Sequence, residues 1–175
     1  MRTRTKVSAN KFDLVATGGT FDEIHIGHIA LLSKAFEVGN NVIIGVTSDE
    51  FAAKTKGKNK INHTYEQRVS NLNDVIQKKI GNSVSYKIYT LDNEYGPVVT
   101  SGKVEALIAS AETAKKGEKI NEIRSKKGLP PIATISVDLV RAEDGSTISS
   151  TRIREGEIDP SGKILKNRQK KLNYL

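Results

Sequence analysis

The chain has 175 residues, of which 37% are hydrophobic and 27% are charged, a composition typical of a globular domain with a proper core. It contains no cysteine, which excludes a disulfide framework and a thiolate metal site. No apolar run approaches the roughly 18 to 20 residues of a membrane span, and the basic N-terminus lacks the apolar stretch of a secretory signal. We therefore expect a cytoplasmic protein.

Positive charge is concentrated in two places, and the formal net charge is +8. Residues 54–60 include four lysines, and residues 163–175 carry five Lys or Arg and no acidic side chain. Such clusters suit either nucleic acid or a small polyanion such as a nucleotide. The sequence has no helix-turn-helix or zinc signature and no aromatic residues between the basic ones, so we do not expect it to bind nucleic acid.

The first third of the chain reads as a leader followed by alternating strands and helices. Residues 1–11 are expected to be flexible. An apolar run predicts a strand over 12–17, and apolar residues at helical spacing predict a helix over 27–38. The β-branched run over 41–47 is typical of a strand covered on both faces of a parallel sheet. A short helix over 48–54 precedes a lysine-rich loop.

The rest of the chain continues the alternation. A capping-box pattern at Thr64 begins a helix with an apolar stripe, and alternating residues predict a strand over 85–91. A strand over 104–109 and a charged helix over 111–127 follow, and a Gly-Leu-Pro-Pro run ends that helix. The last strand is predicted over 132–140, before a loop that leads into another helix start.

This order predicts an α/β fold with a single doubly wound parallel sheet of about five strands. We divide the chain into a leader (1–11), one domain (12–156) and a basic C-terminal extension (157–175). In such sheets ligands bind beyond the carboxyl ends of the strands, where the strand order reverses. The loops that follow the predicted strands should therefore gather at one edge and form the site.

Residues 17–28 are the strongest candidate for part of that site. They join a strand, a Gly-rich turn and a helix start, where backbone N–H groups and the helix dipole favour an anion. Gly18 and Gly19 permit a tight turn, and two histidines three residues apart add side-chain donors. Zinc would need a further ligand, for which Asp22 is the one obvious residue, so a phosphate chain is the better match.

Three motifs in the chain resemble those of the HxGH nucleotidyltransferase superfamily. Residues 19–28 are similar to the first signature, G-T-F-D-x-x-H-x-G-H, and residues 148–154 resemble the second, about 120 residues later. Lys54-Thr55-Lys56 resembles the K-x-K element of several members. Residues 47–51, 65–68, 92–97 and 110–129 are similar to the archaeal and eukaryotic type of phosphopantetheine adenylyltransferase.

The resemblance implies a Rossmann-like fold and a reaction in which ATP and 4′-phosphopantetheine give dephospho-coenzyme A and pyrophosphate. A direct in-line attack of this kind needs positioning and charge neutralisation rather than an enzyme nucleophile, so no covalent intermediate is expected. Mg²⁺ should arrive with ATP, because no carboxylate cluster suggests a metal site in the protein itself.

The motifs also indicate which residues act. We expect His28 to be the main donor to the α-phosphate, with His25 beside it and with Lys54 and Lys56 as mobile cations; Lys58 and Lys60 are alternatives. The residues expected to bind the substrates include Thr20, which the resemblance places at the attacking phosphate, and the Ser-Ser-Thr helix start, at the β,γ-phosphates. They are Thr17, Gly18, Gly19, Thr20, Phe21, Asp22, Gly27, Asp92, Arg141, Ser149, Ser150 and Thr151.

The sequence leaves other functions and other residue roles open. The acceptor could be a different phosphorylated compound, with cytidylyl or adenylyl transfer, or the chain could bind nucleotides or nucleic acid without catalysis. Arg68 could be a surface ion-pair residue, and Arg124 could pair with Glu112 or Glu122 on its own helix. The oligomeric state is not readable from the sequence.

Overall fold

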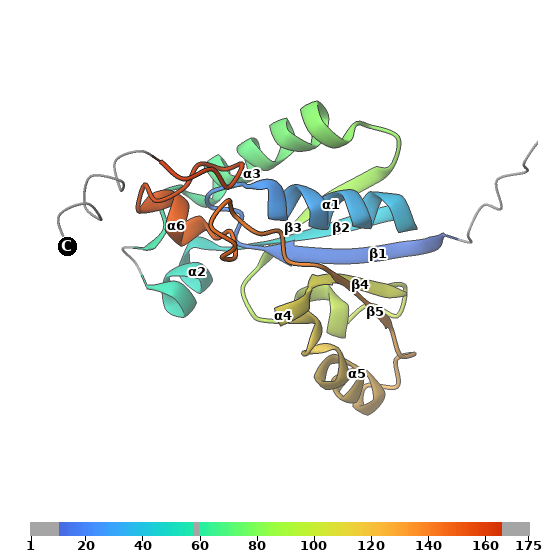
Figure 1. Cartoon of the computed structure of the whole chain (residues 1–175). Coiled ribbons are helices and arrows are strands. Elements are labelled where there is room, and N and C mark those ends of the chain that lie inside the picture. The colour runs from blue at the N-terminus through green and yellow to red at the C-terminus, as the bar shows by residue number, and fades with distance from the viewer. Residues whose placement is uncertain (1–10, 58–59, 166–175) are drawn as a thin grey trace, which may run out of the picture.

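The computed structural model describes residues 11–57 and 60–165, so most of the predicted leader and residues 166–175 of the extension lie outside the described residues. One sheet of five parallel strands organises the described chain, with strand order β3-β2-β1-β4-β5 (Figure 1). The strands are β1 (Phe12–Gly19), β2 (Gly39–Thr47), β3 (Ser85–Leu91), β4 (Ala106–Ser110) and β5 (Ala133–Val137). The predicted doubly wound parallel sheet is confirmed.

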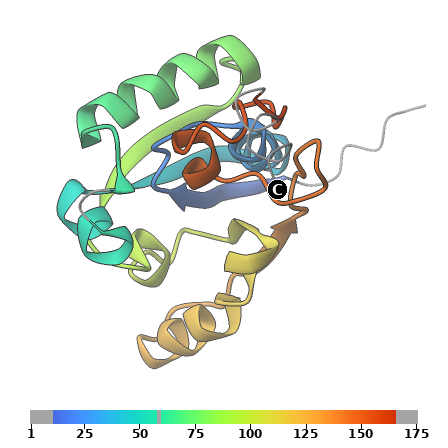
Figure 2. The ribbon, with the colours of Figure 1, turned by 60° about the vertical axis from the view of Figure 1, so that its left-hand side comes forward.

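Helices cover both faces of this sheet, as expected for right-handed crossovers between parallel strands. In Figure 2 α3 and α5 lie on opposite sides of the sheet. The α-helices are α1 (Ile26–Val38), α2 (Asp49–Lys56), α3 (Tyr65–Val75), α4 (Ala111–Ala114), α5 (Gly117–Lys126) and α6 (Ser150–Arg154). A π-helical turn, η2 (Ile76–Ile80), continues α3, and a 3₁₀ turn, η3 (Gly96–Val99), follows β3.

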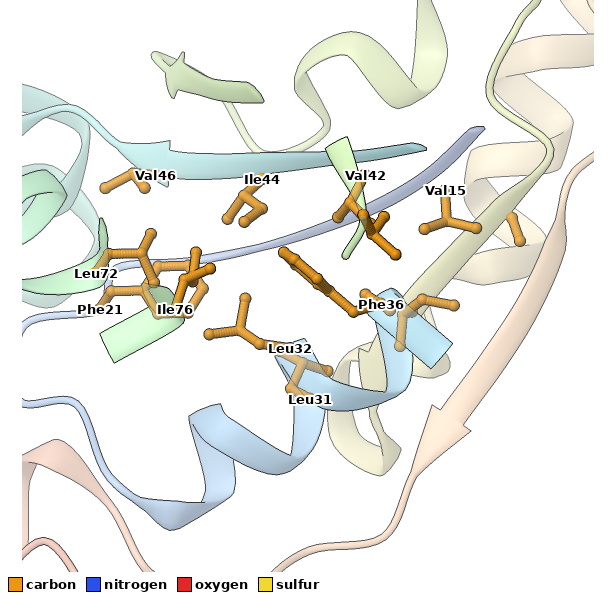
Figure 3. Packing of buried hydrophobic residues seen from close by; sticks show 14 residues of the cluster. Val15, Phe21, Leu31, Leu32, Phe36, Val42, Ile44, Val46, Leu72 and Ile76 are labelled. Atoms are coloured by element: carbon orange, nitrogen blue, oxygen red, sulfur yellow. The ribbon is translucent and has the colours of Figure 1, made fainter. Parts of the chain in front are cut away.

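The larger hydrophobic core lies between the sheet and the helices α1 and α3. Leu32 and Phe36 of α1 point toward Ile44 of β2, and Leu72 and Ile76 close the core on the side of α3 (Figure 3). A second core on the opposite face joins η3 and α5 to the sheet and includes the buried residues Val98, Val99, Leu107 and Ile120. The two cores fix the sheet edge on which the site is built.

Several boundaries differ from the prediction for local reasons. The charged helix expected over 111–127 is two helices, α4 and α5, because the chain breaks at Lys115 and Lys116. Gly117 then packs so closely on β5 that an added Cβ would lie 2.3 Å from the Thr134 hydroxyl oxygen. The predicted strand over 132–140 is reduced to β5.

The lysine-rich segment also differs from the prediction. The helix expected over 48–54 runs two residues further, so Lys54 and Lys56 belong to the last turn of α2 rather than to a loop. Ser48 caps this helix by accepting the Phe51 N–H, as predicted. The difference matters for the site, because residues two apart on a helix point in opposite directions.

Two arginines that the sequence suggested as surface residues are fully buried, so both surface readings were wrong. The Arg124 guanidinium does not pair with Glu112 or Glu122; it donates to four backbone carbonyl oxygens, of Val98, Ser101, Val104 and Pro130. These carbonyls belong to the loops around η3 and before β5. Arg124 therefore stabilises the wall of the second core, since each buried carbonyl needs a donor.

The first part of the predicted C-terminal extension packs against the domain. Ile158 is fully buried and packs with Ala142 and Ile148, and the Ile26 N–H donates to the Pro160 carbonyl oxygen at 3.1 Å. Residues 157–165 thus contact both the start of α1 and the loop before α6. Within the described ranges, no helix is long and apolar enough to cross a membrane.

Replacing Arg124 should destabilise the fold strongly. We expect Arg124→Met to lower the free energy of unfolding by about 3 kcal/mol, because four carbonyls, two of them buried and two part-buried, lose their donor. Urea denaturation followed by circular dichroism measures this change. The control is Lys126→Met on the exposed side of α5, which should change stability by no more than about 0.5 kcal/mol. Equal effects of the two substitutions would contradict the role of Arg124.

Candidate active site

A cleft lies at the carboxyl ends of β1 and β4, between which the strand order reverses. It consists of two adjoining hollows of about 390 and 530 Å³. We call the smaller one the histidine half and the larger one the apolar half. The two halves share part of their lining. The shared set consists of Gly18, Gly19, Thr20, Lys56, Leu107 and Thr113. The position agrees with the edge at which such sheets bind ligands.

The histidine half is built on the N-terminus of α1. His25 is the N-cap residue, and its backbone N–H donates to Nδ1 of His28 at 3.4 Å. The two rings stack with centroids 3.9 Å apart, and the His28 ring also contacts Phe21 at 5.0 Å. Because Nδ1 of His28 accepts a hydrogen bond, Nε2 is the ring atom that carries the proton in the neutral imidazole.

Both histidines are neutral at physiological pH. Burial, together with the nearby His25 and Lys56, lowers the pKa of His28 to about 3. Burial and Lys56 lower the pKa of His25 to about 4. A neutral imidazole donates one hydrogen bond, and a bound polyanion would favour its protonated form. The pair is therefore suited to stabilise negative charge that enters the cleft.

The turn before α1 has features that serve this pair of rings. Phe21 adopts a positive φ of 54° although it is not glycine, and such strain is tolerated mainly at functional positions. A Cβ added to Gly27 would lie 3.0 Å from Nδ1 of His25, so any other residue would press on that ring and shift it. Nδ1 of His25 is buried and has no hydrogen-bond partner among the described residues.

The second motif forms the opposite wall of the histidine half. Ser149, Ser150 and Thr151 all line it at the start of α6. Their hydroxyls already have partners in the protein: Ser149 accepts the Arg152 N–H, Ser150 donates to the Glu23 carbonyl oxygen, and Thr151 accepts from Arg154. The Ser150 O–H is thus used within the protein, whereas the Ser149 and Thr151 hydroxyls only accept, so their O–H groups and the backbone N–H groups of the first helical turn remain as donors to an anion.

Of the two lysines in the K-x-K element, the structure brings one to the cleft. Lys56 lines both halves, and burial lowers the pKa of its ammonium group. Lys54 lines neither half, because two positions along α2 turn it to the other side of the helix. Lys60 also lies off the cleft, and Lys58 lies outside the described residues.

Asp22 is buried and lines neither half of the cleft, so its position differs from that expected of a substrate ligand. Its carboxylate accepts the backbone N–H groups of Asn62 and His63 and contacts the His63 ring, and it lies 3.5 Å from the Arg154 guanidinium. These bonds attach the first motif to the loop after α2 and to the second motif. Asp22 therefore acts as a connector between the motifs.

Asp22, Glu23 and His63 form the one group of possible metal ligands within the described ranges. Their ligand atoms lie within 4.8 Å of one another. However, the Asp22 oxygens are already hydrogen-bonded, and a guanidinium lies beside them, so the group does not match what a cation requires.

Three other predicted substrate residues do not line the cleft. Phe21 supports the His28 ring from below the turn, and Asp92 is exposed at the end of β3. Arg141 donates to the Gly145 carbonyl oxygen within its own loop. Thr17, Gly18, Gly19, Thr20 and Gly27 do line it, together with the residues already described.

The apolar half contains residues that sequence reasoning did not assign to the site. Its lining is largely aliphatic and aromatic, with polar groups at its rim from the loop after β3 and the junction of α4 and α5. Among the unassigned residues that line it are Phe51, Tyr89, Leu91, Asn93, Glu94, Thr113 and Lys116. The available signal was the family resemblance, because the segments 47–51, 92–97 and 110–129 include Phe51, Asn93, Glu94, Thr113 and Lys116.

Comparison with known proteins agrees with this geometry. A family model described as cytidylyltransferase-like matches residues 16–156. A phosphopantetheine adenylyltransferase from Methanothermobacter thermautotrophicus is 47% identical over 156 residues, which are 89% of this chain and 92% of that protein. One from Pyrococcus horikoshii is 39% identical over 158 residues, 90% of this chain and 98% of that protein.

A solved structure is also similar. The crystal structure of a protein of unknown function from Archaeoglobus fulgidus has a TM-score of 0.63 at 30% identity and covers 72% of this chain and 89% of that one. The fold, the cleft and these relatives lead to one conclusion: the chain belongs to the cytidylyltransferase-like family and, within it, to the phosphopantetheine adenylyltransferases, and it is a nucleotidyltransferase.

Proposed function

We propose that this enzyme transfers the adenylyl group of ATP to 4′-phosphopantetheine and releases pyrophosphate and dephospho-coenzyme A. The observation that carries the proposal is the cleft with two unlike halves that meet at Thr20 and Lys56. One half offers donors to phosphates, and the other offers a long apolar surface. Such a division suits one polyanionic substrate and one acceptor with a phosphate at the end of a long uncharged arm.

ATP would occupy the histidine half. The Nε2–H of His28 would donate to an α-phosphate oxygen, and the stacked His25 ring would support it. Backbone N–H groups at the start of α6 would bind the outer phosphates, while Lys56 would stand at the boundary and neutralise charge on both substrates. Thr20, at the end of the Gly-rich turn, would position the attacking phosphate.

We infer a direct in-line displacement without a covalent intermediate. The acceptor phosphate attacks the α-phosphorus of ATP, and pyrophosphate leaves from the opposite side; the protein needs only to align the two and stabilise the growing charge. Mg²⁺ would neutralise the phosphates of ATP when bound. The Asp22, Glu23 and His63 group is a poor match for it, so we expect Mg²⁺ to be held by ATP itself.

The first test is an acceptor panel. Purified protein with Mg²⁺, ATP and 4′-phosphopantetheine should release pyrophosphate, and the same enzyme with nicotinamide mononucleotide, flavin mononucleotide or phosphocholine should not. His28→Ala should lower kcat by about 10²-fold to 10³-fold, because a donor to the transition state is lost; this control ties turnover to the cleft. Turnover only with another acceptor, or with CTP instead of ATP, would replace the proposed function.

The two lysines of the K-x-K element provide a matched pair of variants. We expect Lys56→Ala to lower kcat/KM by about 10²-fold, because its ammonium group is the cation at the junction of the halves. Lys54→Ala removes the same charge from the same helix but should stay within about threefold of the wild type. Steady-state pyrophosphate release measures both, and a larger loss in Lys54→Ala would mean that α2 presents the other lysine to the phosphates.

The protonation state of the histidine pair can be measured by NMR. The sequence contains three histidines, so His25→Asn and His28→Asn assign the two signals. Since burial lowers their pKa values to about 4 and about 3, both rings should stay neutral in the free enzyme from pH 8 to about pH 5. Addition of ATP should raise both pKa values, because the triphosphate stabilises the imidazolium. A pKa near 6.5 in the free enzyme would show that the rings are solvated.

A further inference from the structure

One ion pair stands within the apolar half of the cleft. The Lys116 ammonium group, at the junction of α4 and α5, contacts the Glu94 carboxylate in the loop after β3. Both residues line the apolar half, and neither lines the histidine half. Among the described residues, they are the only charged side chains that line the apolar half outside the shared set. Any charge on a bound acceptor arm would therefore meet this pair.

The fold places Lys116 at this position through the break in the expected helix. Ser110 caps α4 by accepting the Thr113 N–H, and α5 starts at Gly117, which packs closely against Thr134. Lys116 is the N-cap residue of α5, and its backbone N–H donates to the Thr113 carbonyl oxygen. Thr113 lines both halves, so Lys116 follows directly after the boundary between them.

Stability alone does not account for the pair. Both side chains are about half exposed, at 48% and 47%, and exposed ion pairs contribute little to folding. Other exposed pairs, such as Lys119–Glu122 and Lys34–Glu37, join neighbours on one helix. The Glu94–Lys116 pair instead joins two elements across the lining of the cleft. Hydrogen bonding to Lys116 also keeps the pKa of the Glu94 carboxyl low, so the carboxylate stays charged.

We propose that the Glu94–Lys116 pair is a specificity determinant that selects a polar but uncharged acceptor arm. This inference rests on the proposed function. Each charge is neutralised by its partner, so apart from Lys56 at the boundary the apolar half offers hydrogen-bonding groups but no free counter-charge. An arm with a carboxylate would lose its hydration, would be repelled by Glu94, and would find the Lys116 ammonium already paired. An arm with amides and a thiol meets no such penalty.

The test compares two acceptors that differ by one carboxylate, 4′-phosphopantetheine and 4′-phosphopantothenoylcysteine. We expect the wild type to prefer the first by about 10²-fold in kcat/KM. Glu94→Gln leaves Lys116 unpaired, so the preference should fall about tenfold or more. Lys116→Met leaves Glu94 unpaired, so the preference should be kept or should rise. The KM for ATP should stay within about twofold in both variants.

A structural role of the pair would change the preference of both variants in the same way, whereas selection by Glu94 lowers the preference in Glu94→Gln but not in Lys116→Met. Lys119→Met and Glu122→Gln remove an exposed pair on α5 that lies off the cleft, and both should leave the preference unchanged. If the wild type uses 4′-phosphopantetheine but Glu94→Gln keeps the preference within about twofold, this inference is wrong while the proposed function stands. If the wild type uses neither acceptor, the proposed function is wrong, and this inference falls with it.

Discussion

The hydrogen bonds of one buried guanidinium hold the site together. Arg68 of α3 is fully buried and donates to the Thr20 carbonyl oxygen, the His63 carbonyl oxygen and the Asp49 carboxylate. These acceptors belong to the Gly-rich turn, the loop after α2 and the first turn of α2. A buried charge is tolerated only when it is paired and hydrogen-bonded, so the three segments can hardly move apart. The distance between Lys56 and the histidine pair depends on this arrangement.

Asp22 and Arg124 apply the same principle elsewhere. Asp22 joins the first motif to the loop after α2, and Arg124 joins α5 to the loops around η3. In each case a charged side chain satisfies backbone groups of loops, which have no ladder partners of their own. The loops that line the cleft are thus held by buried polar contacts, while the hydrophobic cores hold the sheet. The Lys56 ammonium group, which lines the cleft, takes part in none of these contacts between loops.

Much of the fold could be predicted from the sequence, because β-branched runs and the Gly-rich turn have strong local signals. The same signals predicted that the histidine pair lies at the carboxyl edge of the sheet. The sequence could not show that Lys56 lines the cleft while Lys54 does not, since this depends on where α2 ends. The burial of Arg68 and Arg124 was missed because their acceptors are carbonyls distant in sequence, whereas a charged helix face suggests exposed pairs. The α4–α5 break depends on contact between Gly117 and Thr134, which no local pattern reveals.

The contact between Pro160 and Ile26 has a consequence for how the enzyme matures. The start of α1, which carries both histidines, lies near the beginning of the chain, but one of its backbone N–H groups is satisfied by a segment that follows all five strands. During synthesis the sheet can begin to form while that donor still faces water. The helix start that holds the histidines is therefore completed late, when residues 157–165 have been made and Ile158 has docked beside Ile148. In a growing chain, the sheet therefore precedes the last backbone contact of this helix start.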